Sequence, residues 1–193
     1  MATFTITLDL KEFEAKIAAL QRPRQPIVRA LNRSIASGQI LAVRLIAQDM
    51  GLKVAMVRRF VMTHEASTGS LSATLFASAK RIPLIAFGAS GPEPSRGRGR
   101  GIKSKLKGGA GRYPHAFFAT VGIGRHRGIF ERVGTDLRKS VGAWSQNLPI
   151  RELRGPSIWQ AFQKYIPEAI ARTKEQLVKN IAHEIEFALS KGR

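Results

Sequence analysis

The residues of this chain best suited to chemistry are basic side chains spread through a glycine-rich stretch, residues 89–112. Glu93 is the only acid there. Guanidinium and ammonium groups at this density bind phosphates or acidic protein surfaces. Because no aromatic residue lies among them, they would hold a nucleic acid by its backbone, salt-sensitively and without reading its sequence. The basic residues are Arg96, Arg98, Arg100, Lys103, Lys105, Lys107 and Arg112.

We expect this stretch to be a flexible loop that orders on contact with DNA or a protein partner, since no apolar face runs through it. A loop longer than about 15 residues inside a compact domain is more often functional than not. The alternative is a solvated spacer without a role, but glycine and serine alone would give the same flexibility without the charge.

A second set of basic residues lies in a predicted helix that begins at Ile27. At 100° per residue, Arg29, Arg33 and Arg44 fall on the side opposite an apolar face. The apolar face would pack inside the protein, so the arginines would face solvent, DNA or an anionic partner. The apolar face consists of Ile27, Leu31, Ile35, Leu41, Ala42 and Leu45.

Catalysis has no comparable support. The four histidines lie in different predicted elements, without a second histidine or a carboxylate at metal-ligand spacing. His126 stands between two arginines, and no acid in sequence reach would orient it as a general base. Glu175, Glu184 and Glu186 are expected on a solvated helix face, and no phosphate-binding loop or nucleophile elbow occurs. We expect no enzyme, no catalytic or metal-binding residue and no cofactor.

The composition indicates a folded and strongly basic protein. Of 193 residues, 44% are hydrophobic, and 32 Lys and Arg against 13 Asp and Glu give a net charge of +19. This charge attracts polyanions, and a partner that neutralised it would stabilise the fold. The lack of cysteine excludes disulfides and fits a reducing compartment. No segment approaches the about 20 apolar residues of a bilayer span, so we expect a soluble protein, cytoplasmic when made and without membrane contact.

The first half of the chain predicts one strand and several helices. Alternating polar and apolar residues over 3–10 predict a half-buried strand, and Asp9 then caps a helix. Residues 22–26 break this helix, and the helix from Ile27 ends at Met50-Gly51. A short basic helix is expected over 52–61.

The second half predicts a small, mostly antiparallel sheet followed by helix. We expect strands at 71–77 and 82–87, and two more joined by a short turn within 114–130. Residues 158–165 predict a helix, and Pro167 begins a longer one. The fold class is therefore α+β, a single domain of residues 1–193 with a flexible basic loop at 89–112, a surface excursion at 134–146 and a long C-terminal helix.

Residues 40–61 also have the layout of a helix-turn-helix DNA reader. However, the second helix carries Val54, Met56, Val57 and Phe60 instead of the Asn, Gln or Ser that reach base edges. A basic structural helix pair is the better interpretation, and a DNA-binding protein using residues 40–61 is the alternative function. A packaging nuclease is a third hypothesis, and it would require metal-dependent cleavage.

The stretch 148–157 is unlike ordinary helix or strand. Pro149 pushes Leu148 toward an extended conformation, and Gly155-Pro156-Ser157 is typical of a turn before a helix start. We therefore expect a connector. Its residues include Leu148, Pro149, Ile150, Arg151, Glu152, Leu153, Gly155 and Pro156.

Together with residues 81–88 and 116–133, this connector resembles the minor tail protein Z family of long-tailed bacteriophages, and the resemblance covers most of the chain. It implies a tail-completion protein at the head-proximal end of the tail, made in the host cytoplasm and structural rather than enzymatic. Tail symmetry implies a homohexameric ring, which a closing head-to-tail interface would build.

The resemblance also implies partners. They are tail terminator or tail tube proteins on one side and neck or head-completion proteins on the other, with non-specific contact to packaged DNA in the channel. The connector at 148–157 would then contact the next subunit or an adjoining ring.

Overall fold

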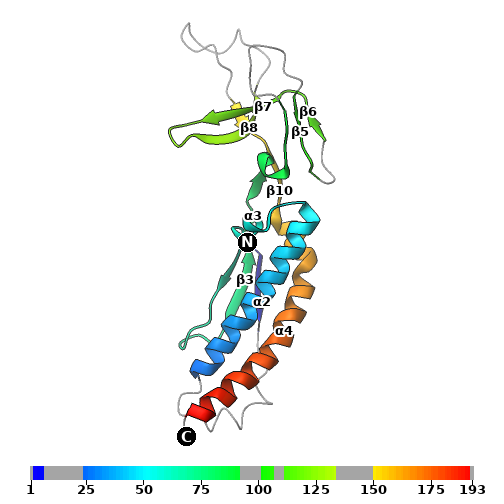
Figure 1. The fold of residues 1–193 in the computed structure, drawn as a ribbon. Helices are drawn as coiled ribbons and strands as arrows, with labels where there is room; N and C mark the ends of the chain where they lie inside the picture. Colours follow the sequence, from blue (N-terminus) through cyan, green and yellow to red (C-terminus); the bar gives the residue numbers. More distant parts are fainter. Residues whose placement is uncertain (1, 7–23, 92–100, 107–110, 134–149, 192–193) are drawn as a thin grey trace. The chain divides into compact units, whose positions relative to one another are not determined.

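The computed structural model describes residues 2–6, 24–91, 101–106, 111–133 and 150–191 (Figure 1). They divide into two compact units. Helices combine with small antiparallel sheets, so the predicted α+β class is confirmed. Unit 1 is drawn from Met1–Asp49, Lys53–Lys80 and Ile158–Arg193, and unit 2 from Met50–Leu52 and Arg81–Ser157.

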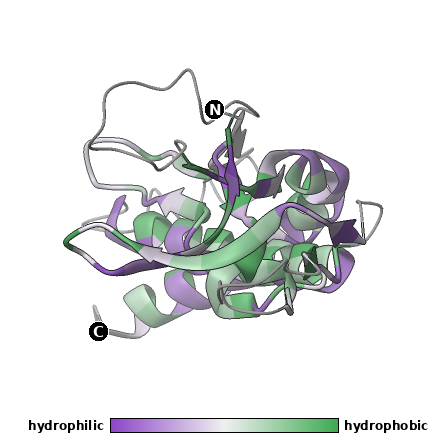
Figure 2. Ribbon diagram, turned by 90° about the horizontal axis from the view of Figure 1, so that it is seen from above, coloured by the Kyte–Doolittle hydropathy of each residue, from purple (hydrophilic) through white to green (hydrophobic). Residues whose placement is uncertain are grey.

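Two long helices lie side by side in unit 1, α2 (Arg24–Met50) and α4 (Ile158–Lys191) (Figure 1). They are antiparallel, because Arg29 near the start of α2 bonds Glu184 near the end of α4, whereas Asp49 at the end of α2 bonds Lys164. The helices carry both hydrophilic and hydrophobic residues (Figure 2). The apolar residues buried in unit 1 include Leu31, Ile35, Ile46, Leu75, Phe162, Leu177, Ile181 and Ile185.

The helix predicted from Ile27 to Met50 is confirmed, and most of its predicted apolar face is buried. The prediction that a second C-terminal helix starts at Pro167 is wrong, because α4 runs through this residue. Pro167 cannot donate a backbone hydrogen bond. Phe162 and Ala169, before and after it, are 0% and 1% exposed, and the burial of this face keeps the helix continuous.

The sheet of unit 1 has three antiparallel strands in the order β1-β3-β2. The predicted N-terminal strand is β1 (Ala2–Ile6), and the predicted strand at 71–77 is β3 (Ala73–Ala77). Alternate residues of β3 are buried, and α4 contacts both β1 and β3. After α2 the chain forms the short helix α3 (Val54–Arg58) and then β2 (Val61–His64), the third strand of this sheet. The predicted short helix over 52–61 therefore ends early, because Val61 joins the sheet; the helix expected after Asp9 lies outside the described residues.

Unit 2 consists of short strands around a small apolar core. β7 (Ala116–Val121) and β8 (His126–Arg132) form the predicted strand pair, and β9 (Ile150–Glu152) adds to β8. β5 (Ile102–Lys103) pairs with β6 (Arg112–Tyr113), and β4 (Arg81–Pro83) pairs with β10 (Arg154–Ser157). The buried residues include Ile82, Leu84, Phe87, Ile102, Phe118 and Ile129.

The strand predicted over 82–87 is only partly correct. β4 ends at Pro83, and Leu84–Phe87 form a 3-10 helix, η2. Positions three apart lie on the same side of a 3-10 helix, so this turn buries both Leu84 and Phe87. Pro83 lies in a two-stranded ladder with a register shift, as expected of proline at a sheet edge or bulge. The excursion expected at 134–146 falls outside the described residues.

Candidate functional site

The basic stretch 89–112 contains regular structure that was not expected. Lys103 exchanges two backbone hydrogen bonds with Ser90, both 2.8 Å long, and β5 pairs with β6 on its other side. Ile102 is completely buried. The expectation of a loop is therefore wrong for Ile102–Lys103 and Arg112, because one buried side chain and two ladders hold them. Arg96, Arg98, Arg100 and Lys107 lie outside the described residues.

Gly101 shows how closely this ladder packs. Its φ of 71° lies in the left-handed region that favours glycine. A Cβ atom here would collide with the backbone of Tyr113 and Pro114. The turn into β5 therefore needs glycine for two separate reasons.

The same ladder places Lys103 directly opposite Arg112. Residues in this position have Cβ atoms about 4.5–5.5 Å apart on one face of the sheet, and like charges there repel. Both residues are exposed, as is Lys105 two positions further on. An anion bound beside them would relieve this repulsion. We call these three residues the β5–β6 basic patch.

The arginines predicted on the polar side of α2 lie in two different environments. Arg29 Nε and Arg33 Nη1 each lie 2.6 Å from an oxygen of Glu184, whose side chain is only 3% exposed. Arg44 is exposed and forms no ion pair with any residue that the structure describes. The anion that Arg29 and Arg33 face is therefore part of the same chain.

Glu184 is the residue that the sequence interpretation misplaced. It was expected on a solvated face, yet it is buried between α4 and α2. The signal was present, because Glu184 follows Leu177 by seven residues and Ile181 by three, both on the buried face of α4. Beside it, Asn180 Nδ2 donates to Ser34 Oγ across 2.9 Å and ties the same two helices together.

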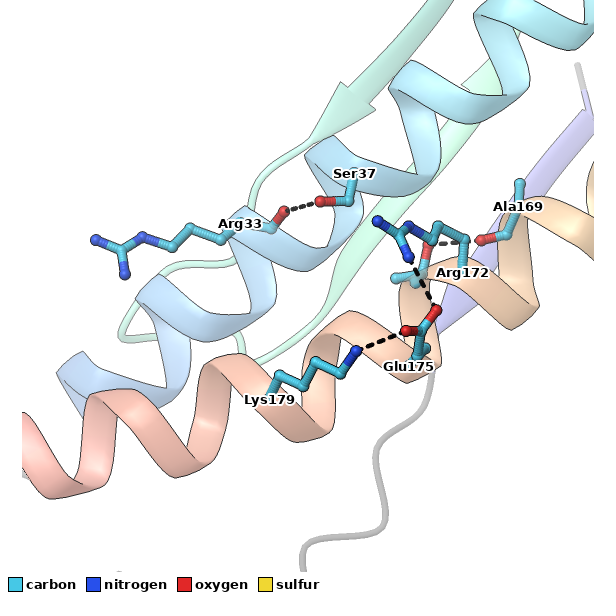
Figure 3. Close-up of polar contacts among 7 residues, drawn as sticks. Arg33, Ser37, Ala169, Arg172, Glu175 and Lys179 are labelled. Carbon is cyan, nitrogen blue, oxygen red and sulfur yellow. Dashed lines mark hydrogen bonds and ion pairs between the residues drawn. The ribbon is translucent and has the colours of Figure 1, made fainter.

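A separate ion-pair cluster lies on the exposed side of α4, where Lys179 and Arg172 both reach Glu175 at 2.7 and 2.9 Å (Figure 3). The hydrogen bond from Lys179, followed by that from Arg172, holds the pKa of Glu175 below its usual value. Exposed pairs of this kind contribute little to stability, so this cluster is a solvated surface feature.

We expect Glu175→Gln to lower the melting temperature only slightly near neutral pH. A carboxyl with a lowered folded-state pKa stabilises the protein above its unfolded-state pKa, about 4.3, and this contribution disappears as the pH falls through the folded-state value. Thermal melts of wild type and variant should therefore converge in acid. Glu168→Gln, which removes an exposed glutamate without an ion pair to a described residue, is the control. If the difference in melting temperature between wild type and Glu175→Gln grew toward acid pH, the lowered pKa of Glu175 would be contradicted.

The described part of the connector, residues 150–157, is mostly strand rather than irregular structure. Leu148 and Pro149 lie outside the described residues; Ile150–Glu152 form β9, and Gly155 and Pro156 belong to β10. Leu153 donates to the Ile129 carbonyl across 2.8 Å and accepts from Leu84 N–H across 3.0 Å. Gly155 packs so closely on Phe87 that a Cβ would lie 2.6 Å from its ring. The backbone hydrogen bonds of the connector therefore hold the strands of unit 2 together.

Side chains of the connector form a polar cluster with β8. Glu131 pairs with Arg151 at 2.9 Å, and Glu152 lies 2.7 Å from His126 Nε2 and 3.0 Å from Arg154. No acid lies near His126 in sequence, as expected, but the fold brings Glu152 to it from 26 residues away. Arg154 shares that carboxylate, so the arrangement is an ion-pair cluster. No group of three His, Asp or Glu side chains in the described parts of the chain could hold a metal ion.

A partly open cleft of about 240 Å³ lies in unit 1 where α2 meets α3. α3 has five residues and a completely buried Val57, so it is too short to serve as the recognition helix of a helix-turn-helix. None of the helices described here is long and apolar enough to cross a membrane. The cleft is lined by Gln39, Ile40, Val43, Arg44, Val54 and Arg58.

Comparison with known proteins assigns the chain to a family. No curated protein and no solved structure matches the chain. The family model of prophage minor tail protein Z (GPZ) matches residues 12–191, which is nearly the whole chain. The chain therefore belongs to the prophage minor tail protein Z family, and it is a structural protein of the phage tail.

Proposed function

We propose that this protein is a tail-completion component at the head-proximal end of the tail, where it forms a ring that joins the tail to the neck and surrounds the DNA channel. One observation carries the proposal beyond family membership. The only acids among the described residues of 81–157 are Glu131 and Glu152, and both are paired with basic side chains. Among the described basic residues there, Arg81, Lys103, Lys105, Arg125 and Arg132 form no ion pair with a described acid.

This excess charge suits a surface that meets polyanions. The β5–β6 basic patch, together with Arg96, Arg98, Arg100 and Lys107 of the same stretch, would contact DNA phosphates or the acidic face of an adjoining ring. Such contacts position a component without reading base sequence. The role requires no reaction, cofactor or metal.

The whole chain acts as one tail-completion domain in this proposal, as a homohexamer with a closed head-to-tail interface. The connector contributes exposed side chains of Ile150, Arg151 and Arg154 to the next subunit or to a neighbouring ring, while its backbone holds unit 2 together. Tail terminator or tail tube proteins and neck or head-completion proteins are the proposed partners.

Charge reversal tests the role of the basic stretch. We expect the triple variant Arg96→Glu, Arg98→Glu and Arg100→Glu to abolish infectious particles while the purified protein stays folded, because the variant removes the anion-binding charge of the stretch. Plaque yield from a prophage carrying the variant measures the loss of infectious particles, and circular dichroism of the purified protein measures its folding.

The matched control reverses three charges elsewhere, at Arg59, Lys80 and Lys174, which are exposed and form no ion pair with a described residue. This control should leave plaque yield near that of wild type. A normal yield from the triple variant of the basic stretch would show that the stretch has no part in assembly.

A further inference from the structure

The cleft between α2 and α3 has a mixed apolar and cationic character. Ile40 and Val54 on its walls are 44% and 51% exposed, which is unusual for large aliphatic side chains, and Val43 beneath them is buried. Arg44 and Arg58 stand beside them without an ion pair to any described residue. At about 240 Å³ the cleft is smaller than small-molecule pockets, which measure roughly 300–1,000 Å³. It suits an apolar side chain with an adjacent carboxylate.

The end of α4 offers that combination. Of the acids that the structure describes, Glu65, Glu168 and Glu186 have no ion pair with another described residue. Only Glu186 lies immediately beside a large exposed hydrophobic residue, Phe187, which is 45% exposed, and Leu189 nearby is 39% exposed. This surface is therefore complementary to the cleft in charge and in apolar character.

The two surfaces cannot meet within one chain. α2 and α4 are antiparallel, so the end of α4 lies beside Arg29, ten residues before the cleft begins at Gln39. Ten helical residues span about 15 Å. Contact therefore requires two copies, and because the surfaces differ, it is head-to-tail, the kind of interface that closes into rings.

We propose that Phe187 and Glu186 of one copy dock in the Arg44–Arg58 cleft of the next. This inference rests on the ring of the proposed function and names one of its contacts. The Phe187 ring would cover Ile40 and Val54, and Glu186 would accept hydrogen bonds from a guanidinium. Stable interfaces bury about 800 Å² per partner, so the cleft is an anchor within a larger interface, as buried aromatic and arginine contacts commonly are.

Disulfide trapping tests the contact directly, because the chain contains no cysteine. The full-length double variant Ile40→Cys, Phe187→Cys should give, on mild oxidation, a ladder of covalent oligomers that ends at the ring size. Each single variant can form at most a covalent dimer. A ladder no longer than that of a matched pair, Ile40→Cys with Glu168→Cys, would overturn the docking.

Charge exchange provides a second readout. Arg58→Glu or Glu186→Arg alone should raise the protein concentration needed for assembly roughly tenfold or more, which corresponds to one lost charged hydrogen bond. Combining the two should restore assembly, whereas Glu168→Arg should not change it. If Arg58→Glu impairs assembly but Glu186→Arg does not, the cleft holds another segment and the proposal is wrong.

Measurements on the wild type distinguish failure of the proposed ring from failure of the Phe187 contact. Light scattering and mass measurement of the wild type report whether a ring forms at all. If the wild type forms a ring, but the double cysteine variant gives no ladder and the combined charge variants do not restore assembly, the Phe187 contact is wrong and the proposed ring stands. A wild type that stays monomeric in solution and within virions overturns both.

Discussion

Replacing Gly38 with alanine is expected to lower the free energy of unfolding by about 2 kcal/mol, although alanine is the better helix former. Gly38 lies in the middle of α2 and faces α4 at close range. A Cβ atom would collide with Thr173 Oγ1 and would stand 3.1 Å from the Ala169 carbonyl oxygen. Thr173 is buried and donates to that same carbonyl across 2.7 Å, so the obstacle cannot move away cheaply.

A double-mutant cycle checks this result by chemical denaturation. Thr173→Ala removes the hydroxyl that the new methyl group meets, so the double variant Gly38→Ala, Thr173→Ala should lose less stability than the two single losses added together. Gly111→Ala is the control, because a Cβ there has no neighbour within 4 Å. Wild-type stability in Gly38→Ala would mean that the helices are not this close.

Glu184→Gln is expected to be the most costly change at a charged residue, at about 2–3 kcal/mol. The nearly buried carboxylate accepts a hydrogen bond from Arg29 and forms an ion pair with Arg33, each at 2.6 Å. Glutamine keeps the size but turns an NH₂ donor toward arginine donors. Arg29 and Arg33 are 43% and 58% exposed, so water can solvate them after the change, and the loss should be below that of a fully buried pair.

Denaturant unfolding of Glu184→Gln beside Glu168→Gln measures this contribution. Both replace a glutamate on α4, but Glu168 is exposed and has no ion pair to a described residue, so its variant should stay within about 0.5 kcal/mol of wild type. Equal stability of the two variants would show that the Glu184 carboxylate is solvated in solution.

Some of the architecture follows from local patterns alone. Period-two alternation located β1 and β3, the glycine-punctuated aromatic stretch located β7 and β8, and the 3.6-residue period with Met50-Gly51 located α2. These signals work because each element buries one face, which a local sequence reports directly. The order of segments was also enough to indicate the minor tail protein Z family, which the family match supports.

The sequence by itself determined that the protein is basic, of mixed α+β class and without cysteine chemistry, and which helix faces are apolar. Only the tertiary structure decided what the polar residues on those faces do. It buried Glu184 against two arginines, formed strands at Ile150–Glu152 and Arg154–Ser157 of the connector, brought Glu152 to His126 and left Arg44 and Arg58 beside an apolar cleft. Each of these depends on partners that are distant in sequence, and the burial of distant surfaces, not local preference, selects them.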